Sequence, residues 1–524
     1  MRNYGIIAAA TLFLTVGCGK GEMQSAASVS TNQLSSAAPQ SDVIARIDWI
    51  GKNQLLADTN AAHLASLWNL PESAKLEKQT LDKLSRAPWL LLLHRAADTN
   101  SAALLRPLLD DMLESESRLE IRETSNNPGA LAFAIRLNNS RAELWKTNLA
   151  KVLQSLTGIQ PAHSGNGWSL KKHDEPNLIE LTRSGDWTIL GIAQNHNDAI
   201  PLLESSLKNP KAQNSTNFWL TADLDLNRIS RAFALSWKLP ENTPKLAFTV
   251  TGDGEYVRTR GELDFPAPLS LNLESWNVPT NFIHGQLNSL TAVRGIGHWL
   301  QSLNLWKNLQ LGDAPNQLFT WGLPGLPPQV YLAAPWADAS NHVARISAKI
   351  LQKGSPWFST NELAGFEKST TFNGIRWKGF PFLYPFLKSE KTAQGEFAIA
   401  GSVLTQGDNS PPPADLITGL LGRTNDVYYD REFTAAKVEQ WIYISQFVRQ
   451  VSGKSQLPFG CASILWLKAI MPKLGSSATD ISQTGPTQLS FARTSGIGFT
   501  AMELNLLADW LESPRFPLGL HTTH

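Results

Sequence analysis

Side chains capable of acid–base, nucleophilic or metal chemistry are present, but they lack the spacing that such chemistry needs. The ten histidines include no HExxH pair, and together with the two cysteines they form no zinc-binding cluster. Gly453-Lys454-Ser455 ends like a phosphate-binding loop, whose backbone amides cradle a phosphate. Val448 stands where the first glycine of that loop is required, so we exclude a nucleotide site of this kind.

Asp223, Asp225 and Asn227 have the spacing of the first ligands of an EF-hand calcium loop. Arg228 replaces the glycine that the loop requires, and Ala234 replaces its bidentate glutamate. The segment instead predicts a strand that leads into the N-cap of a helix. We predict no catalytic residue, no metal ligand and no cofactor, and the sequence favours a protein that is not an enzyme.

The aromatic run 377–387 is the best candidate for a contact surface. Its two prolines forbid a regular central strand, so the run is expected in an edge strand or a loop. Large apolar side chains in such a segment form an exposed patch of the kind that binds partners. Burial under the first folded module is the alternative. The candidate contact residues are Trp377, Phe380, Phe382, Tyr384 and Phe386.

The N-terminus has the features of an export signal, because Arg2 precedes a short apolar run from Gly5 to Val16. The run is shorter than a membrane-spanning helix. Its end, Leu14-Thr15-Val16-Gly17-Cys18, resembles the lipobox of bacterial lipoproteins, although the usual leucine stands one place too early. The resemblance implies cleavage before Cys18 and a lipid, palmitate included, at the new N-terminus. An ordinary signal peptide with a chance cysteine is the alternative.

The segment after the cysteine, up to residue 41, is rich in Ser, Ala, Gln and Gly and has few large apolar residues. Such a composition predicts a flexible tether with an end-to-end distance of roughly 25 Å. The lipobox resemblance implies a lipid anchor in the bacterial cell envelope. No aspartate follows Cys18, since Gly19 and Lys20 come next. In a Gram-negative cell we therefore expect the outer membrane, with the protein facing the periplasm.

The overall composition excludes some classes of partner. The 524 residues include 46 basic and 45 acidic side chains, so the formal net charge is +1. Bulk binding of nucleic acid needs clustered positive charge, and we predict none. With two cysteines only, a chain of this length must be stabilised by its apolar core and not by disulfides.

Five segments are predicted along the chain. They are a signal peptide (1–17), the lipidated cysteine with its tether (18–41), a helical segment (42–88), a first module (89–275) and a second module (276–524). From Trp89 onward, short strands alternate with amphipathic helices. The helical assignment before that point rests on apolar residues at helical spacing, namely Val43, Ile44, Ile47, Ile50, Leu64, Leu67 and Trp68.

Two stretches follow the same order of strand, capping residues and helix. Residues 130–137 form an apolar strand before a helix that ends at Gln154, and residues 330–336 form one before a helix that ends at Gln352. We predict an α+β fold of two duplicated modules, each a mainly antiparallel sheet with helices packed on one face. A chance similarity of strand and helix periodicity is the alternative.

Hairpins are predicted where apolar alternation meets a glycine turn. One spans 179–192 with its turn at Ser184-Gly185, and another spans 245–265. The latter is matched to residues 488–504, with a turn expected at Ser495-Gly496. Alternation on its return strand predicts a solvated face, which carries Arg258, Arg260, Glu262 and Asp264.

These observations favour a non-catalytic, lipid-anchored envelope protein with an internal duplication that binds a protein or an envelope polymer. The membrane is the expected partner of Cys18. A carbohydrate-binding or hydrolytic protein, with a site in a cleft between the modules, is the alternative. Scattered tryptophans, 18 in all, are compatible with sugar stacking but also with ordinary core packing.

Overall fold

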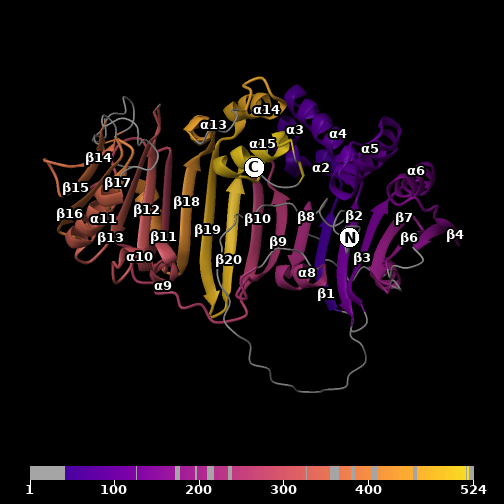
Figure 1. Cartoon of the computed structure of the whole chain (residues 1–524), viewed down its shortest axis with the longest axis horizontal. Helices are drawn as coiled ribbons and strands as arrows, with labels where there is room; N and C mark the ends of the chain where they lie inside the picture. The colour runs from indigo at the N-terminus through magenta and orange to yellow at the C-terminus, as the bar shows by residue number, and fades with distance from the viewer. Residues whose placement is uncertain are drawn as a thin grey trace, which may run out of the picture. The chain divides into compact units, whose positions relative to one another are not determined.

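The computed structural model describes residues 42–124, 127–171, 177–194, 198–208, 218–233, 239–325, 327–353, 365–378, 384–403, 410–411, 414–451, 457–514 and 516–517. Figure 1 labels their helices and strands. These residues form two compact units. Unit 1 contains the described residues of 1–255, 457–469 and 506–524, and unit 2 those of 256–456 and 470–505. This division differs from the predicted boundary at 275–276, because β10 (Val257–Asp264) pairs with β20 (Gln488–Ser495) in unit 2.

The described strands of unit 1 form an antiparallel sheet in the order β4–β5–β6–β7–β3–β2–β1–β8–β9. Their bounds are β1 Asp42–Trp49, β2 Ser117–Thr124, β3 Asn127–Arg136, β4 Ala162–Ser164, β5 Gly167–Lys171, β6 Asn177–Ser184, β7 Trp187–Gln194, β8 Leu220–Leu224 and β9 Lys245–Gly252. The predicted hairpin with its turn at Ser184-Gly185 is confirmed as β6 and β7.

The helices in this part of the chain are α2 Lys52–Ala57, α3 Ala62–Trp68, α4 Pro71–Leu93, α5 Thr99–Glu114, α6 Asn139–Thr157, α7 Ala199–Lys208 and α8 Leu226–Ala232, with a 3₁₀ turn at Thr59–Ala61. Alternation along β3 decides what packs on each face. Leu131, Phe133 and Ile135 join the core beneath α4, α5 and α6. The alanines between them are small enough for α7 to pack on the opposite face, through Ile200 and Leu203.

The predicted helical segment 42–88 is helical only from Lys52 onward. Residues 42–49 are β1, which lies inside the sheet between β2 and β8. A register shift between Val43 and Ala45 interrupts the alternation of this strand, so its apolar residues imitate helical spacing. The prediction of strands from Trp89 was also wrong at that point. Helix α4 runs on through Trp89, whose buried indole donates to the hydroxyl of Ser155 (3.1 Å).

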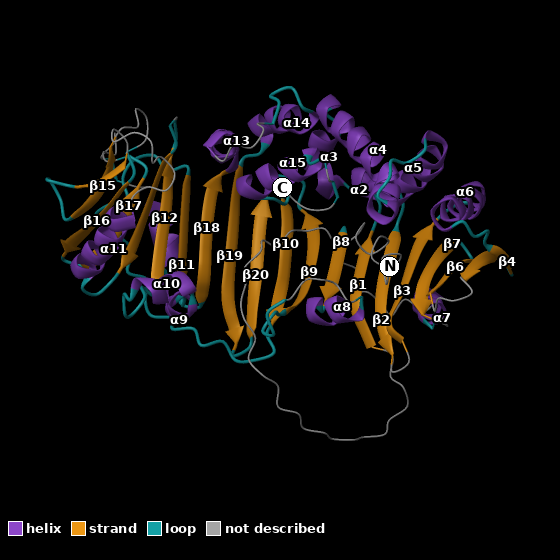
Figure 2. Cartoon of the chain, in the orientation of Figure 1, coloured by secondary structure: helices purple, strands orange, loops and turns teal. Residues whose placement is uncertain are grey.

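The described strands of unit 2 form an antiparallel sheet in the order β14–β15–β16–β17–β13–β12–β11–β18–β19–β20–β10. Their further bounds are β11 Ser289–Arg294, β12 Gln317–Leu323, β13 Gln329–Pro335, β14 Gly365–Lys368, β15 Gly374–Lys378, β16 Phe386–Thr392, β17 Gly395–Gly401, β18 Asp426–Phe433 and β19 Ser476–Gly485. The predicted α+β class with mainly antiparallel sheets is confirmed (Figure 2).

The helices that follow in the chain are α9 Gly297–Ser302, α10 Asn304–Leu309, α11 Ala339–Lys353, α12 Ala414–Leu421, α13 Thr434–Val451, α14 Ala462–Ile470 and α15 Ala501–Glu512, with a 3₁₀ turn at Met471–Lys473. One core of unit 2 gathers large side chains of β12, β13 and β17, such as Phe319, Trp321, Tyr331 and Phe397. Helix α11 packs on the other face of the sheet, where Val343 contacts the cluster around Trp336.

The two units share one order of strands. Adding ten to each strand number of unit 1 gives the order in unit 2 from β14 to β19. Strands β3 and β13 take the same place in the two orders, and each is followed by a long helix, α6 or α11. The duplication of the two modules, with residues 130–137 matched to 330–336, stays a prediction.

The hairpin predicted over residues 488–504 was wrong. Strand β20 pairs instead with β19, through a turn at Pro486-Thr487, and residues 501–512 are helix α15. The helix begins with Thr500-x-x-Glu503, where Thr500 N–H donates to the Glu503 carboxylate (2.8 Å) and Glu503 N–H donates to the Thr500 hydroxyl (3.3 Å). This capping box was a helix-start signal that the strand prediction overlooked.

Matched glycines lie at the start of β5 and β15. A Cβ atom at Gly167 would overlap the carbonyl oxygen of Leu181, and one at Gly374 would overlap that of Leu387. Gly374 also has a φ of +150°. We therefore expect Gly374→Ala to destabilise unit 2 by about 3 kcal/mol, the upper end of the cost of overpacking. Denaturant-dependent hydrogen exchange of the β14–β16 peptides measures this loss.

The matched control is Gly365→Ala on the neighbouring strand β14. A Cβ atom at Gly365 would have no atom within 4 Å, so we expect a change within about 0.5 kcal/mol. Equal effects of the two substitutions would contradict the steric account.

Candidate functional site on strand β18

Strand β18 brings charged side chains to both faces of the unit 2 sheet. It lies between β11 and β19. Because side chains alternate along a strand, Tyr429 and Arg431 project from one face, whereas Tyr428, Asp430 and Glu432 project from the other. The two groups have different surroundings, and each is described in turn.

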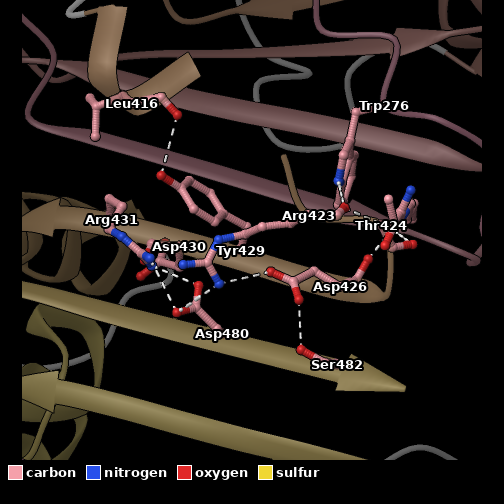
Figure 3. A network of polar contacts seen from close by, with 11 residues as sticks. Trp276, Leu416, Arg423, Thr424, Asp426, Tyr429, Asp430, Arg431, Asp480 and Ser482 are labelled. Carbon is pink, nitrogen blue, oxygen red and sulfur yellow. Dashed lines mark hydrogen bonds and ion pairs between the residues drawn. The ribbon is translucent and has the colours of Figure 1, made fainter. Parts of the chain in front are cut away.

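Two arginines enclose the ring of Tyr429 on the first face (Figure 3). The guanidinium of Arg431 lies 4.2 Å from the ring centroid, and that of Arg423 lies 5.5 Å from it. Arg431 donates two hydrogen bonds to the carboxylate of Asp480 (2.9 and 3.1 Å). Arg423 forms ion pairs with the carboxylates of Asp426 (3.1 Å) and Asp480 (3.3 Å). Fork-shaped pairing of this kind fixes both side chains in place.

The electrostatics of Arg423 combine opposing effects. Burial disfavours its charged form, but the hydrogen bond to Asp426 and the charges of Asp480 and Asp426 outweigh that cost, so the pKa of Arg423 is raised. Asp426 is oriented by a short hydrogen bond from the Ser482 hydroxyl (2.6 Å). The Tyr429 hydroxyl donates to the carbonyl of Leu416 at 3.3 Å. Every member is thus held by a neighbour.

Arg294 holds the turn that precedes β18. Its side chain is only 1% exposed, and its guanidinium donates to the carbonyls of Asp426 (2.7 Å), Thr424 (2.6 Å) and Glu274 (2.6 Å). It also lies 4.3 Å from the ring centroid of Trp276. Burial lowers the pKa of Arg294, opposed by the charges of Asp426 and Glu274. The buried guanidinium therefore fixes the backbone from which Arg423 and Asp426 extend.

The first face continues across the neighbouring strands as rows of polar or small side chains. One row joins Tyr429, Asp480, Ala492 and Arg260 through successive strand pairs. Arg260, Glu262, Asp264 and Ala492 are exposed. The solvated face predicted for residues 258–264 is thereby confirmed. We call this face the polar sheet face, and it consists of Arg258, Arg260, Glu262, Asp264, Arg423, Asp426, Tyr429, Arg431, Ala478, Asp480, Ser482, Gln488, Ser490, Ala492 and Thr494. Of these residues, Asp426 and Tyr429 are buried.

The second face holds two buried carboxylates. Asp430 is 6% exposed and accepts a hydrogen bond from the Thr291 hydroxyl (2.6 Å). Glu432 is 8% exposed and accepts from the backbone N–H of Ala501 (2.7 Å) and from the Ser477 hydroxyl (3.1 Å). Burial raises the pKa of both carboxyls, although these hydrogen bonds oppose the shift. Both groups therefore link β18 to neighbouring elements.

Lys437, one turn into α13, brings a cation to the same face. Burial lowers the pKa of its ammonium group, and the charges of Glu432 and Asp430 oppose that effect. The Nζ atom of Lys437 lies over Gly322 of β12. A Cβ atom at Gly322 would be only 3.2 Å from that Nζ atom. The missing side chain at Gly322 thus leaves room for the lysine. Burial also raises the pKa of the Tyr428 phenol, and the charge of Asp430 adds to that shift.

The aromatic run predicted as a contact surface is only partly exposed. Trp377 is half-buried and packs edge to face against Phe366, with ring centroids 4.8 Å apart. Tyr384 is exposed (44%). The prediction that Phe386 belongs to a contact surface was wrong. Phe386 lies in the core, where its ring fills the space that Gly401 leaves on the neighbouring strand. Phe380, Phe382 and the predicted lipidation site Cys18 lie outside the described residues.

Comparisons with known proteins give no family for this chain: no family model, no curated protein and no solved structure matches it. Among the described residues, no cluster of three or more His, Cys, Asp or Glu side chains is arranged to hold a metal ion. Within the same residues, none of the helices combines the length and the apolar character that a membrane span requires.

Proposed function

We propose that the protein is a non-catalytic, lipid-anchored component of the bacterial cell envelope, and that the polar sheet face of unit 2 binds a protein or an envelope polymer. The observation that supports this proposal is the preformed network in which the partly exposed side chains of Arg423, Arg431 and Asp480 are held by the buried side chains of Tyr429 and Asp426. Ordered charged side chains lower the entropy that a binding partner would otherwise have to overcome.

The charge pattern of the polar sheet face limits the class of partner. Its four arginines are balanced by four carboxylates, those of Glu262, Asp264, Asp426 and Asp480. A balanced face does not select a polyanion such as nucleic acid, which requires an excess of cations. It suits a neutral or mixed-charge partner that offers both donors and acceptors, as peptides and amino-sugar polymers do. This agrees with the near-neutral chain as a whole.

The buried carboxylates do not favour the hydrolytic alternative. A glycosidase needs a pair of carboxyl groups that reach the substrate, one acting as an acid and the other as a base or nucleophile. Asp430 and Glu432 are buried, and they accept hydrogen bonds from Thr291, Ser477 and the N-terminus of α15. These bonds hold strands and a helix together. We therefore assign the two acids to the framework that supports the polar sheet face.

A photo-reactive residue at Ala492 tests the proposal in cells. Ala492 is exposed in the middle of the polar sheet face, and a matched probe at Lys151 lies on the exposed side of α6 in unit 1. We expect a discrete cross-linked product from position 492 and none from position 151. Sensitivity to a protease identifies a protein partner, whereas sensitivity to a muramidase identifies peptidoglycan. No product at 492, or equal products at both positions, would overturn the proposal.

Arg431→Ala is expected to reduce the yield of that product about tenfold, equivalent to about 1.4 kcal/mol of binding free energy. The substitution removes both hydrogen bonds to Asp480 and the guanidinium over Tyr429, so the network loses its fixed geometry. Quantitative gel analysis of the Ala492 cross-link measures the change. Lys378→Ala, at an exposed site on β15, serves as the control and should leave the yield unchanged.

A further inference from the structure

The second face of β18 gathers ionisable groups where three elements meet. Asp430 and Glu432 come from β18, Lys437 comes from α13, and Glu432 accepts the N–H of Ala501, the first residue of α15. We infer that Asp430, Glu432 and Lys437 form one proton-binding site, which takes up a proton as the pH falls below neutral and thereby strengthens the packing of α13 and α15 on β18.

The charge balance of the three groups supports this inference. With all three ionised, two carboxylates and one ammonium leave a net charge of −1 in a place shielded from water. Such a charge is costly to bury. One added proton makes the group neutral without removing a hydrogen-bond acceptor, because a protonated carboxyl keeps an oxygen that can accept. Glu432 can therefore continue to bond Ala501 N–H.

The direction of the pH effect follows from the shifts. Burial raises the pKa of Asp430 and Glu432 above the ordinary values of 3.8 and 4.5. A carboxyl with a raised folded-state pKa adds stability below its unfolded pKa, and that contribution is lost as the pH rises through the folded pKa. Unit 2 should therefore become more stable between neutral pH and about 4.5. Burial lowers the pKa of Lys437, and the charges of Glu432 and Asp430 oppose that shift.

The surroundings on every packed element are compatible with uptake of a proton by the carboxyls. Strand β11 contributes the Thr291 hydroxyl and β19 contributes that of Ser477. Arg493 on β20 is paired with Glu503 of α15 (2.7 Å) and bonded to the Thr479 hydroxyl (3.1 Å). The ionisable groups that face or adjoin the site are Tyr428, Asp430, Arg431, Glu432, Lys437, Arg493 and Glu503.

Hydrogen exchange of the full-length chain tests the inference. Protection of peptides from α13 and α15, corrected for the intrinsic pH dependence of exchange, should rise at least threefold between pH 7.5 and 4.5. Asp430→Asn keeps an acceptor for Thr291 but leaves Glu432 and Lys437 balanced, so the rise should disappear. Lys437→Met leaves two carboxylates without a cation, so the rise should move to higher pH. Glu439→Gln, on the exposed side of α13, should behave like the wild type.

Protection that stays constant or falls with acidification in the wild type would overturn the inference, as would a rise that persists in Asp430→Asn. Carbon-13 signals of the Asp430 and Glu432 carboxyls in the wild type report the pKa of each group and need no variant. If both groups titrated at their ordinary pKa values, the inference would also be overturned. Neither measurement involves a binding partner, so the result is independent of the proposed function.

Discussion

Replacing Cys18 with serine is expected to abolish lipid attachment and to leave a precursor that still carries residues 1–17. A serine hydroxyl cannot form the thioether that the lipobox resemblance implies. Each buried CH₂ group of an acyl chain contributes about 0.8 kcal/mol to membrane binding, and stable anchoring takes at least two chains. Metabolic labelling with palmitate should tag the wild type and not the variant, and mass spectrometry should detect the longer N-terminus.

Cys461→Ser is the matched control, because Cys461 is the other cysteine in the chain. Its thiol lies at the start of α14, 3.5 Å from the Ser463 hydroxyl, in a half-buried place. We expect this variant to take up palmitate like the wild type. A wild-type protein that takes up no palmitate would contradict the lipid anchor and leave the folded units as described.

Glu120→Ala is expected to destabilise unit 1 by about 3–5 kcal/mol. Glu120 is fully buried on β2. One carboxylate oxygen accepts from Arg46 (3.0 Å), and the other accepts from Arg122 (2.9 and 2.6 Å). Removing the carboxylate would take away the two hydrogen bonds that Glu120 accepts from the buried guanidinium of Arg122 and the one that it accepts from Arg46. Denaturant-dependent hydrogen exchange of peptides from β1, β2 and β3 measures the loss.

Glu116→Ala provides the comparison for that result. Glu116 precedes β2 and forms an ion pair with Arg136 (2.7 Å), but the pair is exposed to solvent. Exposed pairs contribute between zero and about 1 kcal/mol, because water screens the charges. If Glu120→Ala lowered the free energy of unfolding as little as Glu116→Ala does, burial of the Glu120 ion pairs would not explain their contribution to stability.

Strands and caps that rest on neighbouring residues could be predicted from the sequence. The apolar run 130–137 predicted a strand, which is β3, and the turn at Ser184-Gly185 predicted the hairpin of β6 and β7. The segment 223–227 was expected to lead from a strand into a helix N-cap, and the carboxylate of Asp225 accepts the N–H of Arg228 (3.0 Å) at the start of α8. The strand predicted at 330–336 is likewise present as β13.

Other elements depended on partners that lie far along the chain. The register shift in β1 disguised a strand that pairs with β2 and β8. One residue of the aromatic run, Phe386, lies in the core and not on a surface, because its ring packs where Gly401 leaves space. Helix α15 had a local signal, the capping box at Thr500 and Glu503, but apolar alternation upstream suggested a hairpin there.

The sequence by itself determined the balanced charge, the α+β class and the solvated face of residues 258–264, whereas the export signal stays a prediction. Those features depend on composition or on side chains within a few positions of one another. Only the tertiary structure decided that Arg431 meets Asp480, and that Glu432 meets the N-terminus of α15. Such pairs are set by strand order and register across the sheet. The pKa shifts of Asp430 and Glu432 come from burial, which arises only when the surrounding elements assemble.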